Sequence, residues 1–101
     1  MSDQRSTVIA MLQKQLQALD AIEKEAVTQS MNTVRGTEEV RKWKARTVAL
    51  IAQQIGPQAA RPLADAKPGP SFTNDLFEEF SDEVELYRER LRALIKSQPP
   101  S

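Results

Sequence analysis

Six large apolar residues in the last third of the chain recur in two interleaved series with a period of seven residues. The first series is Phe77, Val84 and Leu91, and the second, three residues later, is Phe80, Tyr87 and Leu94. Two apolar positions in every seven place all six side chains along one stripe of an α-helix. The pattern therefore predicts a helix over residues 73–97 whose stripe is buried against other helices.

Two earlier segments show apolar residues spaced by three and four, which is also typical of amphipathic helices. The first covers residues 3–31. The second covers residues 37–55, with Thr37 as the expected N-cap and Gly56 as the expected end, where a positive φ suits glycine. Between these two helices, Gly36 is expected in a turn. Residues 56–71 contain four prolines and are expected to form an extended connector, with at most one helical turn after Pro57.

These segments predict an all-α fold, a three-helix bundle with a Pro-rich connector. At 101 residues the chain has the size of one domain, which we place at residues 1–97, followed by a disordered tail at residues 98–101. With 40% hydrophobic and only 5% aromatic residues, the expected core is lean. Such a core suits a monomer, and it equally suits a bundle that gains stability by dimerising.

The single tryptophan, Trp43, has two interpretations. It lies between basic residues, as an aromatic platform for nucleic-acid bases would. It also falls on the apolar stripe of its helix, as a tryptophan that anchors the core would. The indole N–H of such a tryptophan donates a hydrogen bond to a polar group at the edge of the core. We favour the second interpretation. The candidate core anchors are Trp43, Phe77, Phe80, Tyr87, Leu91 and Leu94.

Charge is unevenly distributed along a chain whose formal net charge is zero. Four bases cluster on the second helix, at Arg41, Lys42, Lys44 and Arg46, whereas residues 72–101 contain seven acids and four bases. Opposite charges on two segments indicate that the segments face each other. The same four bases are candidates for contact with a phosphate group or a protein partner.

Several classes of chemistry lack the residues they need. The chain contains no histidine and no cysteine, which are the commonest general base, metal ligands and thiol nucleophile. The three glycines are isolated and form no phosphate-binding loop. We therefore predict no catalytic residue, no cofactor and no metal. No apolar run is long enough to span a bilayer and no signal peptide is evident, so we expect a cytoplasmic protein that does not bind membranes.

The stretch "EEVRKWKARTVALIAQQIGP" and the later "FTNDLFEEF" and "ELYRERLRALI" resemble the amino-terminal helical segments that precede TIR-type or abortive-infection effector domains in bacterial antiphage proteins. The similarity covers about residues 38–95. It implies a non-catalytic adaptor or oligomerising module of bacterial or phage origin. The positions that match are Trp43, Arg46, Leu50, Gly56, Leu91, Leu94 and Ile95.

The sequence therefore favours a small helical interaction or oligomerisation module that binds itself or a protein partner. It is not expected to be an enzyme. The alternative is a small protein that binds nucleotides or nucleic acid through Arg41, Lys42, Lys44 and Arg46.

Overall fold

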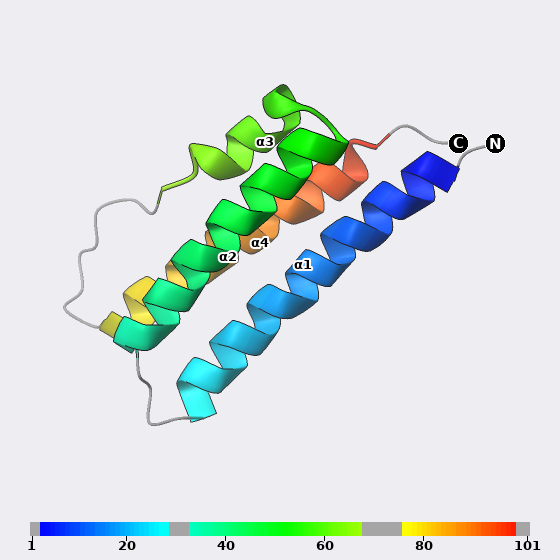
Figure 1. Ribbon diagram of the computed structural model, residues 1–101. Helices are drawn as coiled ribbons and strands as arrows, with labels where there is room; N and C mark the ends of the chain where they lie inside the picture. Colours follow the sequence, from blue (N-terminus) through cyan, green and yellow to red (C-terminus); the bar gives the residue numbers. More distant parts are fainter. Residues whose placement is uncertain (1–2, 29–32, 68–75, 99–101) are drawn as a thin grey trace.

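The computed structural model describes residues 3–28, 33–67 and 76–98. Within these ranges the secondary structure is entirely helical (Figure 1): α1 (Asp3–Thr28), α2 (Thr33–Gln54), α3 (Pro57–Ala64) and α4 (Leu76–Lys96). The all-α class is confirmed. The three-helix bundle is not confirmed, because α3 adds a fourth helix inside the expected connector. Residues 29–31, 68–75 and 99–101 of the predicted helices, connector and tail lie outside the described residues.

Helices α2 and α4 run side by side in the same direction, and α1 runs opposite to both (Figure 1). Helix α1 contacts α2 and α4, and α3 contacts the same two helices, but α1 and α3 do not contact each other. They therefore lie on opposite sides of the α2–α4 pair. A parallel pair requires the chain to return along the bundle before α4 begins, and α3 occupies the start of that return.

Helix α2 begins four residues before the expected N-cap at Thr37. Gly36 is therefore a helical residue and not part of a turn, which corrects the expected boundary. A Cβ atom at this position would lie 3.0 Å from the ring of Phe80 and 3.1 Å from the Cβ of Ala26. These contacts are tighter than nearly all real contacts of a Cβ atom, so glycine lets α1, α2 and α4 converge here without a shift of the neighbouring side chains.

Helix α3 begins immediately after Gly56, which separates it from α2. The backbone of Gly56 has a φ of 145°, which only glycine adopts without strain. The positive φ was expected, although this conformation differs from the left-handed helical one that commonly ends helices. Pro57 suits the first position of α3 because its missing N–H needs no partner there. Burial of Ala60 and Leu63, 3% and 2% exposed, stabilises this short helix against the bundle.

The core follows the predicted stripes and extends along the bundle. It is made of apolar side chains from every helix and of Ala66, which follows α3. The buried apolar residues are Val8, Leu12, Leu19, Ala26, Val40, Trp43, Ile51, Ala60, Leu63, Ala66, Phe80, Val84, Tyr87 and Leu91.

Candidate functional site

Trp43 is a core residue. Its side chain is fully buried, and its indole N–H donates a hydrogen bond of 2.9 Å to the backbone carbonyl oxygen of Gln15 on α1. Its ring stacks on that of Tyr87 on α4, with centroids 6.1 Å apart and planes inclined by 24°. One side chain thus joins three helices and satisfies its only polar atom. It cannot serve as a stacking platform for a ligand without unfolding of the bundle.

The remaining candidate anchors differ in burial. Phe80, Tyr87 and Leu91 are at most 3% exposed, whereas Leu94 is only partly buried at the edge of the core. Phe77 lies outside the residues whose side chains the structure describes. Phe80, Tyr87 and Leu91 therefore lie within the core, and Leu94 lies at its edge.

The four bases of α2 do not form one site. Arg41, Lys42 and Arg46 are exposed, but Lys44 is partly buried on another side of the helix. Helical geometry explains the division, since successive residues are rotated by about 100°. The predicted cluster is therefore an exposed group of three bases and a separate lysine that serves the fold.

Lys44 holds the end of α3 to the bundle. Its ammonium group donates a 2.8 Å hydrogen bond to the backbone carbonyl oxygen of Ala66 and lies 4.7 Å from the centroid of the Tyr87 ring, a cation–π distance. Burial lowers the pKa of Lys44, and the charge of Glu83 acts in the opposite direction. Lys44 therefore links α2 to α4 and to the segment after α3.

Tyr87 extends this junction to Glu83. Its hydroxyl lies 3.5 Å from the Lys44 ammonium, which donates to it, and it donates a 2.7 Å hydrogen bond to the Glu83 carboxylate. Burial raises the pKa of Tyr87, and the hydrogen bond and negative charge of Glu83 raise it further. The phenol therefore stays protonated and contributes structure.

Arg88 on α4 forms the main charged link to α1. Its guanidinium donates hydrogen bonds of 2.6 Å to Asp20 and 2.8 Å to Glu23, and it also pairs with Glu85 on its own helix. Burial alone would lower the pKa of Arg88, but hydrogen bonds to Asp20, Glu23 and Glu85 outweigh it and raise the pKa. The Arg88 side chain is 13% exposed, against 58% for Asp20, so the pairs form at the rim of the bundle.

The predicted pairing between the basic second helix and the acidic last helix is only partly present. Lys44 approaches Glu83 through Tyr87, but the ion pairs between α4 and α1 join the base Arg88 to Asp20 and Glu23. Among the described residues, Arg41, Lys42 and Arg46 have no ion pair. Their charges therefore point to solvent.

Thr47 is the one polar core residue among the described residues. It is fully buried, and its hydroxyl has no hydrogen-bond partner there. An unpaired buried hydroxyl costs free energy. Its place beside Trp43 on the inner side of α2 gives it no access to a ligand from outside.

The described residues contain no group of three or more acidic, histidine or cysteine side chains placed to bind a metal ion. No helix within them is long and apolar enough to cross a membrane. Comparison with protein-family models, curated proteins and solved structures finds no match to this chain.

Sequence reasoning missed three contributors to this arrangement. Gly36 was assigned to a turn because an isolated glycine usually marks one, and a helical glycine at a close approach gives the same signal. Lys44 was grouped with its exposed neighbours, although it lies four residues after Val40 and three before Thr47, both of which are buried. Arg88 was counted only among the four bases of residues 72–101, because its partners on α1 are 65 and 68 residues away in the sequence.

Proposed function

We propose that this protein is a non-catalytic helical module that binds itself or a protein partner. One observation carries the proposal: the side chains that suit ligand chemistry, Trp43, Lys44 and Arg88, are engaged by the bundle itself. What the described helices offer to other molecules is an exposed charged surface, with bases on α2 and acids on α4. Surfaces of this kind steer and select protein partners.

The proposal includes a cytoplasmic location, which suits a chain without cysteine. It also includes a role in bacterial antiphage defence, which comes from the resemblance of Trp43, Arg46 and the helix end at Gly56 to segments of such effectors. In those proteins a helical segment accompanies an effector domain. The module would then bring copies or partners together and leave any reaction to another domain.

Native mass spectrometry and chemical cross-linking in an extract of the native host test this function. We expect the wild-type chain to form a self-complex or a complex with one identified protein at physiological salt. A variant with the exposed bases reversed, Lys42→Glu with Arg46→Glu, should lose that complex while its helical circular dichroism stays unchanged. A chain that stays monomeric and enters no protein complex contradicts the proposal.

The alternative function is nucleotide or nucleic-acid binding by the exposed bases. The exposure of Arg41, Lys42 and Arg46 without ion pairs among the described residues favours it. Titration of a labelled oligonucleotide and of a labelled nucleotide at low salt tests it. Affinity that falls steeply with salt and disappears in the Lys42→Glu, Arg46→Glu variant supports this alternative. Lys44→Gln is the informative comparison, because a lysine bonded to Ala66 should contribute little to such binding.

A further inference from the structure

The two central helices carry outward stripes of opposite charge. On α2 the exposed bases are Arg41, Lys42 and Arg46, and on α4 the exposed acids include Asp82 and Glu89. Lys42 and Arg46 are four residues apart, so they share one side of α2. Glu85 lies between Asp82 and Glu89 at spacings of three and four, so these three acids share one side of α4. We call the first group the basic face and the second the acidic face.

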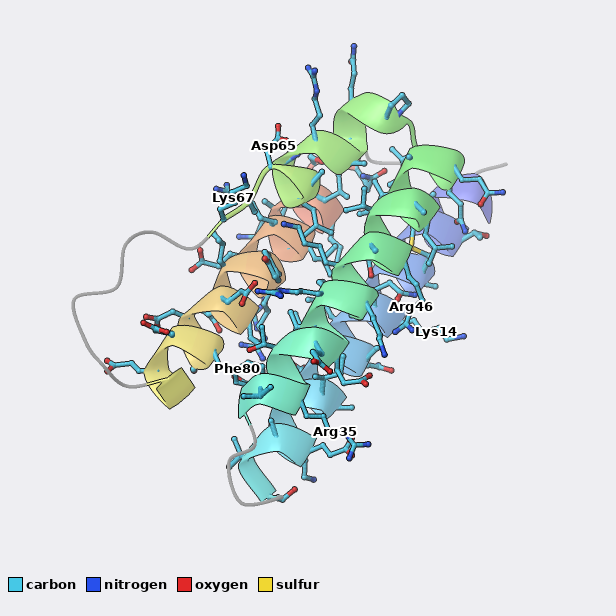
Figure 2. All side chains as sticks on the ribbon, turned by 60° about the vertical axis from the view of Figure 1, so that its left-hand side comes forward. Lys14, Arg35, Arg46, Asp65, Lys67 and Phe80 are labelled. Carbon is cyan, nitrogen blue, oxygen red and sulfur yellow. The ribbon has the colours of Figure 1, made fainter. Side chains whose placement is uncertain are left out.

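The two faces lie on opposite sides of the bundle. Helices α2 and α4 meet through Trp43 and Tyr87, which lie on the inner side of each helix. At 3.6 residues per turn, Lys42 and Arg46 fall on the side of α2 away from its buried residues, and Asp82 and Glu89 do the same on α4. Lys14 of α1 is exposed and lies on the same side of the bundle as Arg46 (Figure 2), which extends the basic face.

This arrangement places like charges beside one another within the basic face. Like charges four residues apart on a helix destabilise it by roughly 0.2–0.5 kcal/mol per pair. Lys42 and Arg46 have this spacing and no ion pair among the described residues, whereas Glu85 is paired with Arg88 and Arg92 on its own helix. A surface of acids placed against the basic face relieves this repulsion.

We propose that the basic face of one copy of this chain docks on the acidic face of a second copy. This inference rests on the proposed function and specifies its partner. The faces are of similar length, since Arg41 to Arg46 spans roughly 8 Å and Asp82 to Glu89 roughly 10 Å at 1.5 Å per residue. Because the faces are different surfaces on opposite sides, the contact is heterologous. It repeats from copy to copy, into a ring where the rotation closes or into an open filament where it does not.

The charge distribution favours a second copy over a polyanion. Proteins that bind nucleic acid in general carry an excess of bases, whereas this chain has 14 bases and 14 acids. An acidic face does not help a nucleic-acid binder, but it is the matching half of a self-contact. Trp43 is also buried, so it is not available to stack on a base.

Two charge-reversal variants separate the halves of the contact. The basic-face variant carries Lys42→Glu and Arg46→Glu, and the acidic-face variant carries Asp82→Lys and Glu89→Lys. All four side chains are exposed, so both variants should fold, which circular dichroism and thermal melting verify. Each variant keeps one intact face, and the two intact faces are complementary.

Sedimentation velocity at low and high salt provides the measurement. We expect the wild-type chain to self-associate at low salt and to dissociate toward monomer as salt screens the faces. Each variant alone should associate about tenfold more weakly or worse. An equimolar mixture of the two should form a complex that stops at one copy of each, because the remaining faces are reversed.

A matched control carries Lys24→Glu and Arg61→Glu, which change the net charge as the basic-face variant does but lie on α1 and α3. It should associate as the wild type does. The inference is overturned if the wild type stays monomeric at low salt, if the mixture of variants forms no complex, or if the control loses association too. A wild type that stays monomeric but binds another identified protein overturns this contact alone and leaves the proposed function standing.

Discussion

Helix α1 is joined to its two neighbours by polar contacts that differ in burial. Toward α2, the indole N–H of Trp43 reaches the Gln15 carbonyl oxygen from a fully buried ring. Toward α4, Arg88 reaches Asp20 and Glu23 at the rim, where Asp20 remains 58% exposed. Burial of an aromatic ring is worth several kcal/mol, whereas exposed ion pairs contribute a fraction of that. The first contact therefore supplies stability, and the second mainly favours one alignment of α1 on α4.

The largest effect is expected from Trp43→Ala, which removes the buried ring from the junction of α1, α2 and α4. We expect a loss of about 3–5 kcal/mol in the free energy of unfolding, measured by urea denaturation followed by circular dichroism. Trp43→Phe, which keeps a ring but loses the N–H donor, should lose less. A loss below about 1 kcal/mol for the alanine variant would show that the ring is not the anchor.

The next effect is expected from Gly36→Ala. The added methyl group meets the Phe80 ring and the Ala26 Cβ at 3.0 and 3.1 Å, so overpacking should cost about 1–3 kcal/mol. The higher helix propensity of alanine offsets about 1 kcal/mol of this cost. Ala49→Gly, at an exposed position on the same helix, is the control and should cost about 1 kcal/mol through helix propensity. Alanine should thus be the worse residue at 36 and the better one at 49. If alanine were the more stabilising residue at both 36 and 49, the close packing of Phe80 and Ala26 on Gly36 would be refuted.

An alkaline transition should follow from Tyr87. Burial raises the pKa of this phenol above its ordinary value, so above about pH 10 the unfolded chain releases the proton first and binds fewer protons than the folded chain. The free energy of unfolding should therefore fall by up to about 1.4 kcal/mol per pH unit in that range. Urea denaturation at several alkaline pH values measures this slope. In the Tyr87→Phe variant, the free energy of unfolding should fall with pH less steeply than in the wild type, by up to that amount. Equal slopes in the two proteins would show that Tyr87 does not cause the alkaline loss of stability.

A gain in stability is expected from Thr47→Val. The two side chains have nearly the same shape, and valine removes a buried hydroxyl that has no partner among the described residues. We expect an increase of about 1 kcal/mol in the free energy of unfolding. The same substitution at the exposed Thr28, whose hydroxyl bonds to the carbonyl oxygen of Lys24, should bring no gain. A loss of stability at Thr47 would show that its hydroxyl is bonded in solution.

The smallest effect is expected from Arg88→Gln. Removal of the charge from a rim contact should cost about 1 kcal/mol or less at low salt, and the difference from wild type should shrink as salt is added. Urea denaturation at two salt concentrations measures it. If this variant lost as much stability as Trp43→Ala, the charged contact would be as important as the buried one, and the comparison of the two sides of α1 would fail.

The sequence predicted the inner sides of the long helices well because periodicity reports burial directly. The seven-residue series placed Phe80, Tyr87 and Leu91 in the core, and the stripe on the second helix placed Trp43 beside them. Helix α3 was not predicted because its prolines are also typical of extended connectors. Its formation depends on Leu63 and Ala60 finding a surface on α2 and α4, which is tertiary information.

The least predictable property was the side of the bundle on which each charged residue lies. Opposite net charge on two segments indicated that they pair, and α2 and α4 are indeed neighbours. The pattern does not say which side of each helix faces the other. Of the four bases, Lys44 bonds to α4, and Arg41 is near enough for its charge to act on Tyr87. Apolar burial decides the rotation of each helix, because it outweighs exposed ion pairs several-fold. Lys42 and Arg46 therefore face outward.

The most direct test of this account is the hydrogen-exchange rate of the Trp43 indole N–H, measured by NMR. The chain has one tryptophan, so the spectrum contains one indole signal that needs no assignment. If the ring is buried and bonded to Gln15, the proton should exchange only when the bundle opens, at least about 1,000-fold more slowly than in a free indole. Exchange at the rate of a free indole in the folded protein would place Trp43 at the surface and contradict the account.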